Sequence, residues 1–414
     1  MAGIPAGLPA GVRLSDHISL GVIARAVPPA RVRRVLAETG KASERERDLP
    51  AQVMVYYTIA LALYMGSSTR EVLRCLLEGL RWLWGAEAVK VAGKSGISQA
   101  RSRLGEAPLR RLYEDLVQPI ATRASKGAWY RGWRLASLDG TCLDVADTEE
   151  NRAAFGLLGA SRGASAFPQL RLVALVENGT HVLFGARFGR YAEGETTLAH
   201  DVLGALRPGL LCLADRQFFG RALWHAAVAT GADLLWRVKG NLRLPRGTVL
   251  PDGSYLATIY PGEADRRHRT GGVQVRVVEY RLEGMPDAEP LYRVVTTILD
   301  PNQAPAAELA ALYHERWEIE VALAELKTGL REDRAARGAG GAALQDPGAG
   351  APGGLGPAAG AFRGARPDAR SRSAGRRGSR PAFLLARRAG GPPQGAAVRR
   401  TFPLGPGAPC IRRC

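Results

Sequence analysis

The segment Tyr313–Lys327, with the sequence YHERWEIEVALAELK, has the pattern around which the rest of the chain is organised. On an α-helix, which turns about 100° per residue, four polar side chains of this region share an arc of roughly 60°: Tyr313, Arg316, Glu320 and Lys327. An apolar stripe lies directly beside that arc: Leu312, Ile319, Leu323, Leu326 and Leu330. The segment therefore predicts a helix with one edge in a core and the neighbouring edge at the rim of a site.

Two interpretations of this helix remain open from the segment alone. Arg316 and Glu320 are four positions apart, and such pairs most often decorate a solvated helix surface. In the alternative, Glu320 holds a metal ion while Arg316 and Lys327 hold phosphates. The segment by itself favours the solvated surface, and the rest of the chain shifts the balance towards a site.

Length and charge indicate a multidomain protein with a polyanionic partner. The chain has 414 residues, enough for two or three domains, and a formal net charge of +18. The segment from residue 331 onward contains 16 arginines and 4 acidic residues, so it carries +12 and leaves +6 for the first 330 residues. Most of the positive charge therefore lies in the last fifth of the chain.

The cysteine pattern and the hydropathy predict a cytoplasmic protein without a membrane anchor. The 5 cysteines are scattered singly, as in a reducing compartment, and the N-terminus lacks the pattern of a signal peptide. The longest apolar run, Val53–Met65, is shorter than the roughly 20 residues that cross a bilayer. It predicts a buried helix instead.

Residues 1–125 have helical patterns and are expected to form a DNA-binding domain. Val32–Leu36 predicts one helix, Pro50 begins another in its first turn, and Ser68–Trp82 begins with a capping box. The basic helix Ser95–Leu104 follows, which is typical of a small helical DNA-binding unit. A surface helix of an ordinary bundle explains the charge equally well.

Two strand patterns end in acids. Trp133–Thr141 predicts a strand that runs into a tight turn at Gly140, with Asp139 projecting from the strand end. Asp144 is expected in mid-strand and Asp147 as a helix cap, so Asp139 is the preferred candidate.

The second acid follows Gly209–Ala214, a nearly continuous apolar run typical of a strand covered on both faces. Its terminal Asp215 is costly to bury unpaired, so it needs a metal ion or the adjacent Arg216.

The order of elements predicts an α/β fold. A hairpin around Asn178-Gly179, a helix over 195–206 and a strand over 232–238 complete the pattern. Residues 241–299 are rich in glycine, proline and β-branched residues, with a strand at Val273–Tyr280. The basic cluster Arg266–Arg269 is expected on a loop, either solvated or in contact with DNA.

The spacing Tyr-x2-Arg-x3-Glu-x6-Lys in Tyr313–Lys327 resembles the signature of the IS4-type DDE transposases of bacterial insertion sequences. Asp139-Gly-Thr-x-Leu, followed by Asp147-Thr-x-x-Asn151 and Phe155-Gly156, resembles the first catalytic segment of that family. Ala214-Asp-Arg-x-Phe218 resembles the second. The resemblance covers about residues 15–330.

The resemblance implies a ribonuclease-H-like mixed sheet with an inserted β-subdomain, preceded by the helical domain. Together with the sequence patterns, it gives the following boundaries: 1–125 helical, 126–240 first catalytic part, 241–300 insertion and 301–330 catalytic helix, followed by the segment 331–414, to which the resemblance does not extend. It also implies that Asp139, Asp215 and Glu320 are the catalytic metal ligands. Tyr313, Arg316 and Lys327 are implied to bind DNA.

Three acids suit phosphodiester chemistry because two divalent cations, about 3.5–4 Å apart, activate a hydroxyl and stabilise the leaving oxygen. We expect Mg²⁺, with Mn²⁺ as a substitute, held by Asp139 between both ions and by Asp215 and Glu320 at one each. The expected protein is a nucleoid-associated homodimer on DNA that cleaves terminal inverted repeats and joins 3′ ends to target DNA. A small-molecule substrate is not expected, and nucleophile, P-loop and dinucleotide motifs are absent from the sequence.

Residues 331–414 are dominated by glycine, alanine, proline and arginine and lack tyrosine, tryptophan and lysine. Such a segment cannot bury enough apolar surface to fold, so a disordered tail is expected. It is either a basic DNA-binding arm or, as we favour, the product of a GC-rich gene read out of frame. A frameshift would remove packing support from Glu320. The alternative function is then an inactive transposase descendant that only binds DNA.

Overall fold

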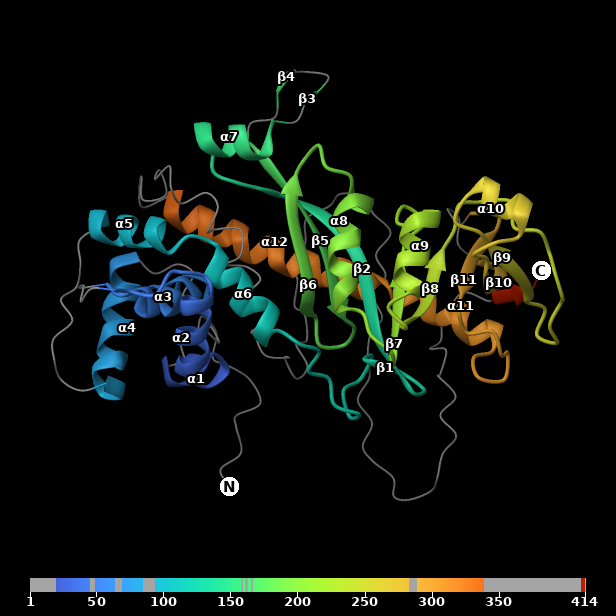
Figure 1. The fold of residues 1–414 in the computed structure, drawn as a ribbon, viewed down its shortest axis with the longest axis horizontal. Helices are drawn as coiled ribbons and strands as arrows, with labels where there is room; N and C mark the ends of the chain where they lie inside the picture. Colours follow the sequence, from blue (N-terminus) through green and yellow to red (C-terminus); the bar gives the residue numbers. More distant parts are fainter. Residues whose placement is uncertain are drawn as a thin grey trace, which may run out of the picture.

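The structure, a computed structural model, describes most of the chain up to the end of the predicted catalytic helix. The described residues are 20–44, 49–63, 69–84, 94–157, 159–160, 163–164, 167–282, 289–338 and 411–413. Helices of the N-terminal part lie at one end, a large sheet fills the middle, and the strands of the predicted insertion lie at the other end (Figure 1).

Six helices form the N-terminal part: α1 (Leu20–Ala26), α2 (Pro29–Glu38), α3 (Ala51–Leu63), α4 (Thr69–Trp84), α5 (Lys94–Leu104) and α6 (Ala107–Leu116). Helix α3 is the central one, because its side chains are buried on nearly every side. The predicted helices are thus confirmed, and Val53–Met65 contributes to this buried helix as far as Leu63. Ser68 of the predicted capping box lies outside the described residues.

One mixed sheet organises the rest of the chain, in the order β12-β10-β11-β8-β7-β2-β5-β6. Its strands are β1 (Trp129–Tyr130), β2 (Trp133–Asp144), β5 (Gln169–Glu177), β6 (Val182–Arg190), β7 (Leu210–Ala214), β8 (Asp233–Arg237), β9 (Tyr255–Ile259), β10 (Val273–Leu282), β11 (Tyr292–Thr296) and β12 (Ile411–Arg413). Strands β6, β5 and β2 are antiparallel, whereas β2, β7 and β8 are parallel. This is the expected ribonuclease-H-like arrangement. A separate pair, β3 (Gly159–Ala160) and β4 (Gly163–Ala164), lies outside it.

The strands of the predicted insertion extend this sheet and do not form a sheet of their own. Strand β11 pairs antiparallel with β8, and β10 pairs with both β11 and β9. The basic cluster Arg266–Arg269 was expected on a loop, but Arg266 to His268 belong to the short helix α10 (Glu263–His268). Arg269 ends this helix in the left-handed conformation, with φ of 56°.

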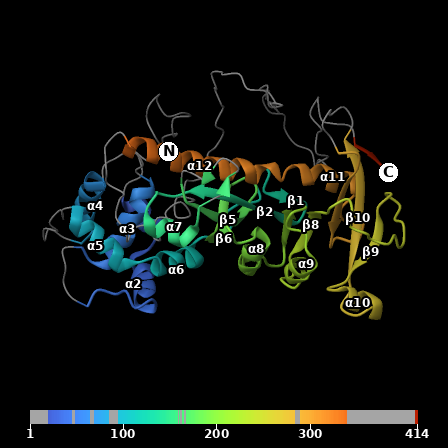
Figure 2. The same ribbon diagram turned by 90° about the horizontal axis from the view of Figure 1, so that it is seen from above.

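Helices cover both faces of the sheet (Figure 2). One face carries α8 (Glu195–Val202), the 3₁₀ turn η2 (Leu203–Ala205) and α9 (Arg221–Val228); the other carries α11 (Ala306–His314) and α12 (Trp317–Gly338). Strand β5 shows the division, since alternate side chains of a strand point to opposite faces. Leu172, Ala174 and Val176 pack in the cluster that contains α12 residues. Val173 and Leu175 pack in the cluster that contains α8 residues.

Strand β2 corrects the first predicted turn. Gly140 pairs with Val173, and the strand continues to Asp144, so Asp139 does not end it. Asp147 is not the helix cap either, because Thr148 caps α7 (Glu149–Phe155) by accepting from the Asn151 N–H at 3.2 Å.

The predicted single helix over 313–327 is in fact two helices with a tight junction. Helix α11 ends at His314 and α12 begins at Trp317. Amides of Glu315 and Arg316 bond to carbonyls three residues back, which tightens the turn to 3₁₀ geometry and breaks the regular 100° progression. Helix α12 then reaches Gly338, 8 residues beyond Leu330, because residues 331–337 are mostly good helix formers. Residues 339–410 and 414 of the predicted tail lie outside the described residues.

Candidate active site

The pairing register brings Asp139 and Asp215 side by side. The last parallel pair between β2 and β7 joins Leu138 to Ala214. Asp139 is the next residue of β2 and Asp215 directly follows β7, and neighbouring strands lie about 4.8 Å apart. Leu138 and Ala214 pack on the α8–α9 face. Because side chains alternate, both acids project towards the α11–α12 face.

Arg316 lies on that face and connects two of the predicted acids. Its Nη1 donates to Asp139 Oδ2 at 2.9 Å, and its Nη2 donates to Glu320 Oε1 at 2.8 Å. Since both nitrogens belong to one planar guanidinium, those two carboxylate oxygens are at most about 8 Å apart. The side chain of Glu320 is 60% exposed, whereas those of Arg316 and Asp139 are 15% and 20% exposed.

Asp215 lies within electrostatic reach of the same group. Its charge acts on both Tyr313 and Arg316. The alternative ion pair between Asp215 and Arg216 does not form, because the Arg216 guanidinium bonds to Glu289 at 2.7 Å and only its amide donates to Asp215. Asp215 is therefore not neutralised by its neighbour.

Burial perturbs the ionisation of this cluster. Burial raises the pKa of Asp139, although Arg316 opposes the shift. Burial also raises the pKa of Tyr313, which is 5% exposed and stays a neutral phenol. Burial disfavours the charge on Arg316, but Tyr313 and the surrounding acids together raise its pKa.

The remaining residue of the four-residue pattern, Lys327, lies farther along. It follows Glu320 by seven residues on α12, a rise of about 10 Å. The helical spacing predicts one continuous stripe of four side chains. The structure differs, because the helix is interrupted between His314 and Trp317, Tyr313 is buried and Lys327 lies well beyond Glu320. Tyr313 and Arg316 lie near the acids, and Lys327 lies two helical turns beyond Glu320.

A fourth acid, Glu195, lies beside Asp139 and is absent from the sequence-based set. A Cβ built on Gly140 would lie 2.7 Å from Glu195 Cδ, so the carboxylate rests against the backbone next to Asp139. Arg171 pairs with Glu195 at 3.3 Å. Burial raises the pKa of Glu195, and the charge of Asp139 adds to the shift. The signal in the sequence is Gly140 inside a strand, which often marks a close approach.

The carboxylates are suitable ligands for a divalent metal ion, but their present arrangement does not form a metal site. Among the residues that the structure describes, no group of three or more His, Cys, Asp or Glu side chains could hold a metal ion. Carboxylate oxygens are the donors that Mg²⁺ and Mn²⁺ prefer, and the Arg316 cation lies between Asp139 and Glu320. Closing the acids around an ion would require Arg316 to turn away.

Comparisons with known proteins identify the family of this chain. Residues 17–114 match the family described as the insertion element 4 transposase N-terminal domain, and residues 133–337 match the transposase DDE domain. The fold and these two matches thus define a DDE transposase.

Two relatives from Escherichia coli strain K12 are similar over most of the body. The transposase InsG for insertion sequence element IS4 is 27% identical over 311 residues, 74% of this chain and 68% of InsG. The putative transposase InsZ is 28% identical over 229 residues, 54% of this chain and 74% of InsZ. This chain belongs to the IS4 family of insertion-sequence transposases. None of the helices within the described ranges has the length and apolar character needed to span a membrane.

Proposed function

We propose that this transposase binds the terminal inverted repeats of its element, cleaves DNA strands there and joins the 3′ ends to target DNA. The observation that carries the proposal is the placement of Asp139 on β2 and of Asp215 directly after the adjacent strand β7, with Glu320 linked to Asp139 through Arg316. The N-terminal family match and the net charge of +18 support DNA as the partner.

We assign each acid a role towards Mg²⁺, or Mn²⁺ as its substitute. Asp139 would be shared by two ions, and Asp215 and Glu320 would each hold one. Such ions, when bound, supply an activated hydroxyl and stabilise the leaving oxygen of a phosphodiester. Arg316 would hold a phosphate bidentately, and Lys327 would hold another phosphate about 10 Å along α12.

Tyr313 has a positioning role in this proposal. It is buried at the end of α11 and its backbone oxygen accepts from the Arg316 amide at 3.2 Å, so it fixes the junction that orients Arg316. The enzyme would act as a homodimer on DNA at the nucleoid, where its substrate is, and would need no small-molecule substrate.

The test is a gel assay with the full chain, DNA carrying the element ends, and Mg²⁺ or Mn²⁺. Wild-type protein should nick the DNA, and Asp139→Asn, Asp215→Asn and Glu320→Gln should lower cleavage by at least about a thousandfold while binding is retained. Asp147→Asn is the matched control, because that exposed acid pairs with the exposed Arg152.

Two results would contradict the proposal. Cleavage at the wild-type rate by the three variants would remove the acids from the chemistry. Binding without cleavage by the wild type in either metal would instead support the alternative, a transposase descendant that only binds DNA.

A further inference from the structure

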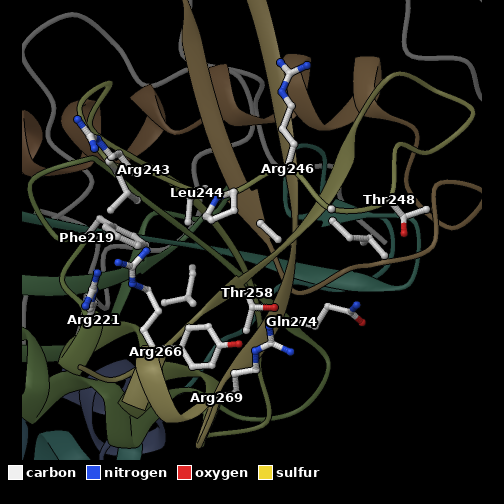
Figure 3. A pocket seen from close by; sticks show the side chains of 17 residues that line it. Phe219, Arg221, Arg243, Leu244, Arg246, Thr248, Thr258, Arg266, Arg269 and Gln274 are labelled. Carbon is white, nitrogen blue, oxygen red and sulfur yellow. The ribbon is translucent and has the colours of Figure 1, made fainter. Parts of the chain in front are cut away.

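An arginine-lined cleft of about 490 Å³ lies at the end of the sheet away from the N-terminal helices. The segment 242–248, strand β9 and helix α10 form its walls. Its volume is in the range of about 300–1,000 Å³ that is usual for ligand clefts. Figure 3 shows arginines on several sides of it; these are Arg221, Arg243, Arg246, Arg266 and Arg269.

Three of these arginines pair with acids. Arg221 and Arg266 share Glu263, at 3.6 Å and 2.5 Å. Arg246 pairs with Glu279 at 2.5 Å.

Arg243 and Arg269 have no acidic partner within the part of the chain that the structure describes. Both are exposed and line the cleft, and no Asp or Glu is among the described residues that line it. The cleft therefore carries excess positive charge, which favours an anionic ligand.

The floor of the cleft is apolar and partly aromatic. Strand β9 contributes Leu256, Ala257, Thr258 and Ile259 to the lining, and Tyr260 directly follows the strand. Ala257 and Ile259 are also buried in the core below.

Phe219 adds a second ring beside Arg221 and Arg266 (Figure 3). Aromatic surface next to free cations suits a nucleic-acid strand whose bases are unpaired. A duplex offers only its backbone to such a cleft, since its base faces are stacked inside.

The cleft begins close to the catalytic acids. Phe219 follows Asp215 by four residues, so the two Cα atoms are at most about 14 Å apart. A DNA strand advances about 3.4 Å or more per nucleotide, so a few nucleotides cover that distance. Asp215 projects towards the α11–α12 face, whereas Phe219 and Arg221 lie on the α8–α9 side, so one strand would reach both Asp215 and the cleft by passing around the end of β7.

We propose that this cleft binds a single-stranded segment of DNA that adjoins the scissile phosphate. Arg243 and Arg269 hold its phosphates, and Phe219 and Tyr260 contact its bases. The inference rests on the proposed transposase function for the position of the scissile phosphate. The binding itself needs no catalysis.

The test measures fluorescence anisotropy of the full chain in EDTA, with a single strand of about 12 nucleotides and with the matching duplex. The double variant Arg243→Ala/Arg269→Ala should lose at least about tenfold in single-strand affinity. Its slope of log K against log salt should fall by about 1.4, since each phosphate contact on a single strand contributes about 0.7. Duplex affinity should change by less than about twofold. The tail, with its charge of +12 from residue 331 onward, contributes equally to every variant.

Arg267→Ala is the matched control, because Arg267 is exposed on the same helix α10 but does not line the cleft. Tyr260→Leu tests the base contact. It should lower single-strand affinity by about fivefold or more and leave the salt slope unchanged, because stacking releases no counterions. Thermal unfolding of each variant confirms that it is folded.

An unchanged salt slope in the double variant would overturn the site. So would an equal loss for the duplex, or an equal loss in Arg267→Ala, since either would indicate a general effect of charge. Failure of the wild type to cleave, with the slope still reduced, would reject the proposed function and leave the cleft standing. Cleavage that depends on the acids, with an unchanged slope, would reject the cleft alone.

Discussion

Asp139 and Arg316 are 177 positions apart in the chain and form a hydrogen bond of 2.9 Å at the centre of the candidate site. The same guanidinium bonds to Glu320 at 2.8 Å, so a single cation links the strand that carries one acid to the helix that carries another. The hydrogen bond holds the junction between α11 and α12 next to the point where the parallel pairing of β2 with β7 ends. It also keeps two carboxylates close together before any metal ion binds, because the cation offsets their repulsion.

Replacing Arg316 should impair both cleavage and stability. Arg316→Ala leaves the mostly buried Asp139 without its cation, which we expect to lower the free energy of unfolding by about 1–3 kcal/mol. Strand cleavage by Arg316→Ala should fall by at least about a hundredfold. The cleavage rate of Arg316→Lys should lie between those of the wild type and Arg316→Ala, because an ammonium group keeps the charge but cannot reproduce the planar fork of the guanidinium. Denaturant unfolding and single-turnover nicking measure the two effects. Arg152→Ala, which breaks an exposed pair with Asp147, should cost less than about 1 kcal/mol; an equal cost in both variants would argue against the central role of Arg316.

A side chain at Gly140 should displace Glu195. The new Cβ of Gly140→Ala would lie 2.7 Å from Glu195 Cδ, and Arg171 holds that carboxylate in place. We expect a loss of about 1–2 kcal/mol in the free energy of unfolding, partly relieved in the double variant Gly140→Ala/Glu195→Ala. Gly132→Ala is the control, because nothing lies within 4 Å of its added Cβ. Additive effects in the double-variant cycle would show that the two positions do not interact.

Glu315, at the junction between α11 and α12, should make stability depend on pH. Burial, with a smaller contribution from Glu318, raises its pKa from 4.5 to about 7. The folded protein therefore binds this proton more tightly than the unfolded chain does, so stability falls as pH rises from about 4.5 through about 7.

Glu315→Gln removes this charge, and we expect it to stabilise the protein by up to about 3 kcal/mol at pH 8, with the gain disappearing towards pH 4.5. Thermal unfolding across that range measures it. Glu325→Gln is the control, because that side chain is 66% exposed on α12. A gain for Glu315→Gln that is the same at both ends of the range would refute the assignment.

The gene itself tests the origin of the tail. If the segment after α12 is out of frame, one of the other two frames beyond the codon for Gly338 should encode renewed amphipathic helix with tyrosine, tryptophan or lysine. Sequencing the locus with its flanks gives the answer, together with any inverted repeats. Polar, low-complexity sequence in both other frames would favour a genuine basic tail.

The sequence predicts much of the architecture because strongly periodic segments keep their local structure. The buried helix α3, the hairpin of β5 and β6 and the apolar strand β7 all form as their patterns predict. Predictions were wrong where one residue type is compatible with two local structures. Gly140 permits a turn but also a close approach inside a strand, and Asp147 permits a cap that the adjacent Thr148 takes instead.

By itself, the sequence determined the family and the α/β class, and it supplied the three acids of the proposal, because motifs of fixed spacing can be recognised without knowledge of contacts. Only the tertiary structure decided which groups meet. The register of β2 against β7 places Asp139 beside Asp215, and the 3₁₀ junction turns Arg316 towards both Asp139 and Glu320. Such contacts depend on pairing between segments up to 177 positions apart, and local periodicity contains no information about that pairing.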